Sequence, residues 1–161
     1  MCEFVTPFLF KKGIITMKKL YTIGYTQKSA EEFFSLLDVN GIQMILDIRL
    51  YNNSQLAGFT KQDSLQYFLE ELLGVAYRCS SLMAPSKELF NDNRKNGLSW
   101  KDYEFRFNQI IRNRAIQHMI EEYQIDHTCL LCCEPEATNC HRRLVAEYLQ
   151  RHFDGIEIIH I

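Results

Sequence analysis

The sequence predicts an α/β fold in one domain, with a mostly parallel sheet covered by helices on both faces in a Rossmann-like three-layer arrangement. Short apolar runs alternate with longer amphipathic segments along residues 19–161. Strands that are separated by helices are joined by right-handed crossovers, which makes the sheet largely parallel. The length of 161 residues suits a single domain with one core.

The chain begins with a predicted βαβ unit whose strand, helix and second strand lie at residues 20–25, 29–40 and 44–49. Ser29 is placed to cap the helix, and Glu32 three residues later completes a capping box. Gly41 follows at the position where helices commonly end. The second strand, MILDIR, has the apolar character of a buried strand.

The middle of the chain has a weaker pattern. A helix is predicted over residues 61–73, which carry an apolar face, and a third strand over residues 75–79. Residues 82–97 contain Pro85 with several Asn, Asp and Gly residues, so we expect an irregular segment with at most a short helix at residues 86–90. An insertion or a lid would lie in this segment.

The last third of the chain returns to a clear alternation. Apolar residues at helical spacing predict a helix over residues 100–123, with a break near Asn113. The most apolar strand, TCLLCCE, is predicted at residues 128–134, followed by a helix at residues 139–153 and a last strand at residues 156–161. The sequence contains no internal repeats.

We expect residues 1–16 to be an upstream extension, disordered or loosely packed, and the domain to span residues 17–161. Residues 11–13 (KKG) require purine-rich codons that resemble a bacterial ribosome-binding site, three codons before Met17. The alternative is an N-terminal strand or arm that packs on the domain through its aromatic side chains.

The composition excludes several classes of protein. A net charge of −2 creates no general attraction for polyanions, so a nucleic acid would need a local basic patch. No apolar stretch approaches the roughly 18 residues that span a bilayer, so we expect no membrane association. Three of the six cysteines lie within residues 129–133 and no export signal accompanies them. We therefore expect reduced thiols and a cytoplasmic protein.

Polar residues end the predicted strands, where ligands of open parallel sheets bind. Tyr25 ends the first strand, Asp47 and Arg49 the second, and Cys132 and Glu134 the fourth. Because side chains alternate along a strand, Asp47 shares a face with Arg49, and Cys132 with Glu134. Charged residues at the ends of buried strands are costly unless paired, and functional sites often carry this cost.

The helix after the fourth strand opens with Cys140, His141 and Arg142. Free backbone amides and the helix dipole attract anions at such a helix start, and guanidinium groups add bidentate partners.

Three roles are open for the cysteines. Cys140 is a candidate nucleophile, because a helix start beside a histidine and arginines lowers the pKa of a thiol. Cys132, Cys140 and His141, with Glu134 as a fourth ligand, are a candidate metal site, but no CxxC pair supports it. In the third role, both cysteines are small buried residues that pack a strand against a helix. We rank packing slightly above catalysis and both above metal, and predict no bound metal.

Several motifs together resemble the domain-of-unknown-function family 488: TIGYT, DIR, LAGF, APSKELF and CCEPEATNCHRR. The resemblance covers nearly all of residues 17–161. The family positions that find matches here are Gly24, Tyr25, Asp47, Arg49, Pro85, Lys87, Cys132, Glu134, Cys140, His141 and Arg142. The resemblance locates a site and implies no particular activity or cofactor.

The leading hypothesis is an enzyme that acts on an anionic substrate: a phosphorylated compound, a nucleotide or a nucleic-acid end. Arg49, Arg142 and Lys87 would hold the anion, and Asp47 or Glu134 would act as acid or base. Either Cys of the CxE...CHR motif would be an optional nucleophile, and Tyr25 would supply stacking. The alternatives are a non-catalytic module that binds a nucleotide or nucleic acid, and a structural protein whose polar cluster is an internal network.

Overall fold

The computed structural model describes residues 17–53 and 57–161. The expected upstream extension, residues 1–16, lies outside the described residues.

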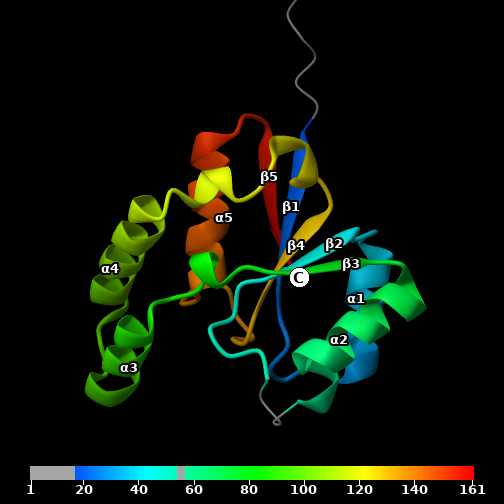
Figure 1. Ribbon diagram of the computed structural model, residues 1–161, viewed down its shortest axis with the longest axis horizontal. Helices are drawn as coiled ribbons and strands as arrows, with labels where there is room; N and C mark the ends of the chain where they lie inside the picture. Colours follow the sequence, from blue (N-terminus) through cyan, green and yellow to red (C-terminus); the bar gives the residue numbers. More distant parts are fainter. Residues whose placement is uncertain (1–16, 54–56) are drawn as a thin grey trace, which may run out of the picture.

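The fold is the predicted α/β fold: one five-stranded parallel sheet with helices on both faces (Figure 1). The strands follow the order β3-β2-β4-β1-β5. They are β1 (Lys18–Gly24), β2 (Met44–Asp47), β3 (Ala76–Cys79), β4 (Thr128–Cys132) and β5 (Ile156–His160). The helices are α1 (Ala30–Val39), α2 (Gln62–Phe68), α3 (Lys87–Asn96), α4 (Trp100–Asn113) and α5 (His141–His152).

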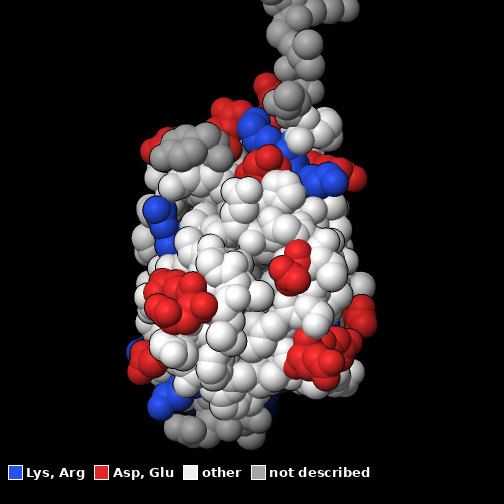
Figure 2. All heavy atoms as spheres, turned by 90° about the vertical axis from the view of Figure 1, so that its right-hand side faces the viewer, with Lys and Arg blue, Asp and Glu red and all other residues white. Residues whose placement is uncertain are grey.

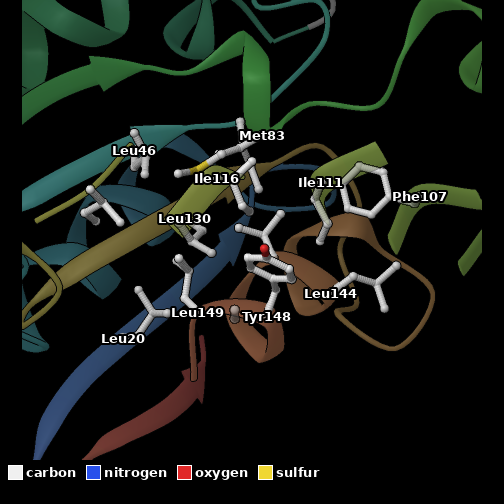
Figure 3. Packing of buried hydrophobic residues seen from close by; sticks show 14 of the residues in the cluster. Leu20, Leu46, Met83, Phe107, Ile111, Ile116, Leu130, Leu144, Tyr148 and Leu149 are labelled. Carbon is white, nitrogen blue, oxygen red and sulfur yellow. The ribbon is translucent and has the colours of Figure 1, made fainter. Parts of the chain in front are cut away.

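Two apolar clusters fix the layers. One joins the sheet to α4 and α5 and contains Leu130 of β4 together with Leu144 and Leu149 of α5 (Figure 3). The other joins the opposite face of the sheet to α1 and α2, around Phe33 and Leu65. Burying these side chains away from water is the main term that stabilises such a layered domain.

The strand order creates a switch point at the carboxyl ends of β1 and β4. These two strands are neighbours, yet α1 after β1 covers one face of the sheet and α5 after β4 covers the other. The connections therefore diverge at this edge and leave a crevice between them, which is where ligands bind in open α/β sheets.

The predicted start of the first helix is confirmed at Ser29. Ser29 is the N-cap of α1, and its side chain accepts a hydrogen bond from the amide of Glu32 at 3.1 Å. The long predicted helix after residue 99 breaks as expected, because α4 ends at Asn113 and a 3-10 turn begins at Ile116.

The segment expected to be irregular contains a ten-residue helix, α3. Ser86 caps its start by accepting a hydrogen bond from the amide of Leu89 at 3.1 Å, and Gly97 ends it at a φ of 59°. Only Leu89 of this helix is buried, so its apolar periodicity is too weak to predict its length.

Figure 2 shows the side of the molecule that carries α1 and α2. Acidic side chains are scattered over the described part of this face, and the few basic ones in view lie along its margins, so its centre carries no basic patch. The first turn of α1 contributes Glu31 and Glu32 to this acidic surface. No helix in the described residues has the length and apolar character needed to cross a membrane.

Candidate functional site

A pocket of about 740 Å³ opens where β1, β2 and β4 end. Tyr25 lies directly after β1, Arg49 lies two residues after β2, and Cys132 is the last residue of β4. Cys140 and His141, at the start of α5, also line it. The structure therefore brings together most of the residues that the sequence singled out.

A buried group of two thiols and one imidazole forms the base of this site. One donor atom each from Cys132, Cys140 and His141 lies within 4.8 Å of the other two. All three side chains are buried, yet each contributes to the pocket lining. The sulfur atoms are thus shielded from bulk water but reachable from the pocket.

The orientation of His141 is set by the backbone. Its Nε2 lies 2.9 Å from the carbonyl oxygen of Ile48, which can only accept, so Nε2 carries a proton. The other ring nitrogen, Nδ1, lies 3.5 Å from Sγ of Cys132. Nε2 lies 3.7 Å from the same sulfur but is engaged by the Ile48 carbonyl, so Nδ1 is the ring nitrogen that remains available to the thiols.

The thiols differ in acidity. The hydrogen bond from Cys132 lowers the pKa of Cys140 to about 4, and His141 acts in the same direction. Burial raises the pKa of Cys132 well above its ordinary value, and hydrogen bonding to Cys133 and Cys140 adds to this effect. The charge is therefore expected on Cys140 and the proton on Cys132.

The Cys140 thiolate also changes the pKa of His141. Burial alone lowers the pKa of this imidazole, but the hydrogen bond and the negative charge of Cys140 outweigh that effect and raise it above its ordinary value. A cysteine thiolate beside an imidazolium is the arrangement that activates nucleophilic cysteines.

Cys133 also lines the pocket, and it packs against the apolar cluster on the α1 and α2 face of the sheet. Hydrogen bonds with Cys132 and Tyr25 lower the pKa of Cys133 to about 7, against the effect of its burial. Cys133 shares this face with Cys129 and Leu131, so the alternation of side chains along β4 continues through Cys133.

Asp47 lies beneath the pocket and does not line it. Its fully buried carboxylate accepts hydrogen bonds from Nε of Arg49 at 2.8 Å, from Nη2 of Arg49 at 2.6 Å and from the hydroxyl of Tyr77 at 2.6 Å. Arg49 also donates to the carbonyl oxygen of Thr60 at 2.9 Å and lies over the ring of Tyr25, with its guanidinium carbon 5.4 Å from the centroid. Asp47 thus holds Arg49 against the pocket wall.

Arg142 and Lys87 do not line the pocket. The buried guanidinium of Arg142 donates to the carbonyl oxygens of Glu134 and Pro135, and to the hydroxyl of Thr22. Lys87 is exposed at the first turn of α3. Arg142 thus fastens the loop between β4 and α5, while the side chain of Glu134 remains exposed at the pocket.

Gly24 is required where this loop crosses the end of β1. A Cβ atom at Gly24 would overlap the carbonyl oxygen of Glu134 and lie 2.7 Å from Nη1 of Arg142. We expect Gly24→Ala to destabilise the protein by about 1–3 kcal/mol, because neither the buried arginine nor the backbone can move freely. Gly58→Ala is the matched control, since a Cβ there meets no atom within 4 Å. Urea unfolding of both variants measures the difference, and an equal response would contradict the expected clash.

The pocket walls are largely aromatic. The ring of Trp100 stacks on Tyr103, with centroids 5.4 Å apart, and Tyr51 meets the edge of Phe90 at 5.3 Å. Arg94 of α3 adds an exposed guanidinium to the lining and makes no hydrogen bond or ion pair with the described residues. Arg94 was not predicted as a site residue, because the helix predicted from the sequence ended at residue 90. Ser86 and Gly97, which cap the two ends of α3, were the signals that could have extended it.

Cys132, Cys140 and His141 are also a set that a soft divalent ion could use. Glu134, the fourth ligand that the sequence suggested, is not part of this group, so the three side chains would supply one fewer than the four ligands of a structural zinc site.

The fold and the site define an α/β protein with a thiol-lined pocket at the carboxyl edge of its sheet. The chain belongs to the family described as Domain of unknown function DUF488, whose sequence model matches residues 29–149. No curated protein and no solved structure matches the chain. The family resemblance seen in the sequence is therefore confirmed. The matched region includes every candidate site residue except Tyr25, which precedes it.

Proposed function

We propose that this protein is an enzyme that acts on an anionic substrate with Cys140 as its nucleophile. The observation that supports it best is the position of Cys140, at the start of α5 within 4.8 Å of both Cys132 and His141, in the lining of an open pocket. A structural thiol would not need a neighbouring imidazole whose far nitrogen is held by a backbone carbonyl.

The roles of the other residues follow from what they touch. His141 stabilises the Cys140 thiolate and returns a proton through Nδ1 when the product leaves. Glu134 is the pocket carboxylate placed for acid or base work, whereas Asp47 and Arg142 position Arg49 and the loop at residues 134–135. Asp47 is therefore reassigned from acid or base to a positioning residue, and Arg142 from anion binding to the same class.

The substrate we propose is a flat ring that carries a phosphate, such as a nucleotide or the terminal nucleotide of a nucleic acid. The aromatic rings of Tyr25, Tyr51 and Trp100 provide faces for stacking. Arg94 provides a guanidinium for the anionic group, since the guanidinium of Arg49 is already engaged by Asp47. Arg94 thus takes the role that the sequence assigned to Lys87 and Arg142.

A binding experiment tests the anion site. With AMP as the probe, Arg94→Ala should weaken binding by about 10- to 150-fold, because a charge-assisted hydrogen bond contributes about 1.5–3 kcal/mol. Lys95→Ala is the matched control, because Lys95 is the adjacent exposed cation of α3 and does not line the pocket. Titration calorimetry with AMP and with adenosine separates phosphate from ring recognition. Equal losses in the two variants would contradict the assignment.

A turnover screen tests the nucleophile. With a panel of phosphorylated compounds and nucleotides, Cys140→Ser should abolish product formation while AMP affinity is kept. Retained binding with no turnover by the parent protein would favour the non-catalytic module. Stoichiometric zinc in the purified parent protein, lost in Cys140→Ser, would assign the three side chains to a metal instead.

A further inference from the structure

Two thiols lie at the base of the pocket, and the proposed reaction gives a role to Cys140 but none to Cys132. Cys140 and Cys132 come from different elements, the start of α5 and the end of β4, and their sulfur atoms lie within 4.8 Å of each other. Both residues line the pocket, so a small molecule in the pocket reaches the pair. One nucleophile would not require a second thiol at this distance.

We propose that Cys140 is a site of reversible oxidation by hydroperoxides, and that Cys132 is its resolving cysteine. The inference rests on the proposed function only in that both require a reactive Cys140. The ligand class is a hydroperoxide, and the product is an intramolecular Cys132–Cys140 disulfide.

The chemistry proceeds in two balanced steps. Sulfur of the Cys140 thiolate attacks the terminal oxygen of the hydroperoxide, the O–O bond breaks, and the leaving alkoxide or hydroxide takes the Nδ1 proton of the His141 imidazolium to become an alcohol or water. Cys140 is oxidised to a sulfenic acid and the hydroperoxide is reduced. The Cys132 thiol then attacks the sulfenic sulfur, which forms the S–S bond and releases water.

Local geometry selects Cys132 over its neighbour as the resolving residue. Sγ of Cys132 lies within 4.8 Å of the donor atoms of Cys140 and His141, whereas Cys133 is not part of this group. Nδ1 of His141 lies 3.5 Å from Sγ of Cys132. After it has given its proton to the leaving oxygen of the hydroperoxide, Nδ1 accepts the proton of the Cys132 thiol and passes it to the departing hydroxide.

The disulfide would change the activity of the site. It removes the nucleophile from the pocket, so substrate turnover stops until a thiol reductant attacks the disulfide and restores both thiols. It also protects Cys140 from irreversible conversion to sulfinic acid.

Peptide mapping of the full chain after treatment with hydrogen peroxide tests the proposal. A protease that cleaves after glutamate separates the two sulfurs, because Glu136 lies between Cys132 and Cys140. We expect a cross-linked pair of peptides, an intact mass lower by two hydrogens, and full reversal by dithiothreitol. Cys132 and Cys133 share a peptide, so variants are needed to tell them apart.

Two matched variants make this distinction. Cys133→Ser should still form the cross-link, whereas Cys132→Ser should lose it and accumulate a sulfenic acid at Cys140 that dimedone traps. A cross-link that survives in Cys132→Ser, or one that joins two protein molecules, would overturn the proposal without reference to the folding of either variant.

The outcome is separable from that of the proposed function. If Cys140 of the parent protein reacts rapidly with iodoacetamide but peroxide yields only sulfinic acid, the resolving role of Cys132 is refuted and the nucleophile stands. If Cys140 reacts with neither reagent, both proposals fail.

Discussion

Asp47→Asn is expected to lower the free energy of unfolding by about 3–5 kcal/mol, because it leaves the charge of Arg49 buried without its partner. The side chains of Asp47 and Arg49 are 0% and 2% exposed, and they meet at 2.6 Å. Asparagine keeps the shape of the side chain but removes the charge. Urea unfolding with linear extrapolation gives the difference from the parent protein.

Asp92→Asn provides the matched control. Asp92 and Arg106 form an ion pair at a similar separation, 2.8 Å, but their side chains are 37% and 35% exposed. Water already solvates these two charges, so we expect a loss of no more than about 1 kcal/mol. Similar losses in the two variants would mean that burial of the Asp47–Arg49 pair has no energetic consequence.

A second substitution separates charge from shape. Replacing Arg49 by methionine in the Asp47→Asn background removes the stranded charge, and it should recover part of the lost stability. No recovery would show that the destabilisation comes from the hydrogen bond of Tyr77 to Asp47 instead of from the unpaired arginine.

The fold was predictable because its signals are local and repeated. Apolar runs such as MILD and TCLLC correspond to β2 and β4, whose residues are all buried. Ser29 marked the start of α1 through the chemistry of its side chain. In contrast, α3 exposes most of its length, so its apolar pattern carried little information and only its two caps identified it.

The convergence of the candidate site residues was predictable, whereas several of their contacts were not. Strand ends predicted that Tyr25, Arg49 and Cys132 would meet at one edge, and all three line the pocket. The hydrogen-bond partners of the Arg142 guanidinium were not predictable, because they depend on where the loop after β4 places its carbonyl oxygens. Arg142 and Asp47 were singled out for their charge, but both charges are used inside the protein.

The reactivity of Cys140 is expected to differ greatly from that of an ordinary thiol. An ordinary cysteine has a pKa near 8.5, so only a small fraction is ionised at pH 6. Hydrogen bonding from Cys132 and the neighbouring His141 hold the pKa of Cys140 well below that value. Thiolate forms as the pH rises through the pKa, so Cys140 should hold on the order of a hundredfold more thiolate at pH 6 than an ordinary cysteine.

Cys79 is the internal control for this comparison. Cys79 lies on β3 and is exposed to solvent as a residue. Partial burial of its thiol raises its pKa, and the negative charge of Asp47 raises it further. Its alkylation should therefore fall away below about pH 8. His141→Gln removes the imidazolium and should shift the pH dependence of Cys140 upward while that of Cys79 stays in place.

The central claim is that Cys140 is a thiolate nucleophile, and the pH dependence of its alkylation tests this most directly. The measurement is the rate of iodoacetamide addition to Cys140 and Cys79 in the same full-length sample, resolved by peptide mass spectrometry between about pH 4 and 10, a range that spans ordinary and lowered thiol pKa values. We predict that Cys140 keeps its full rate down to at least about pH 6 while Cys79 does not. A Cys140 rate that rises only near or above about pH 8.5, in parallel with Cys79, would contradict the account.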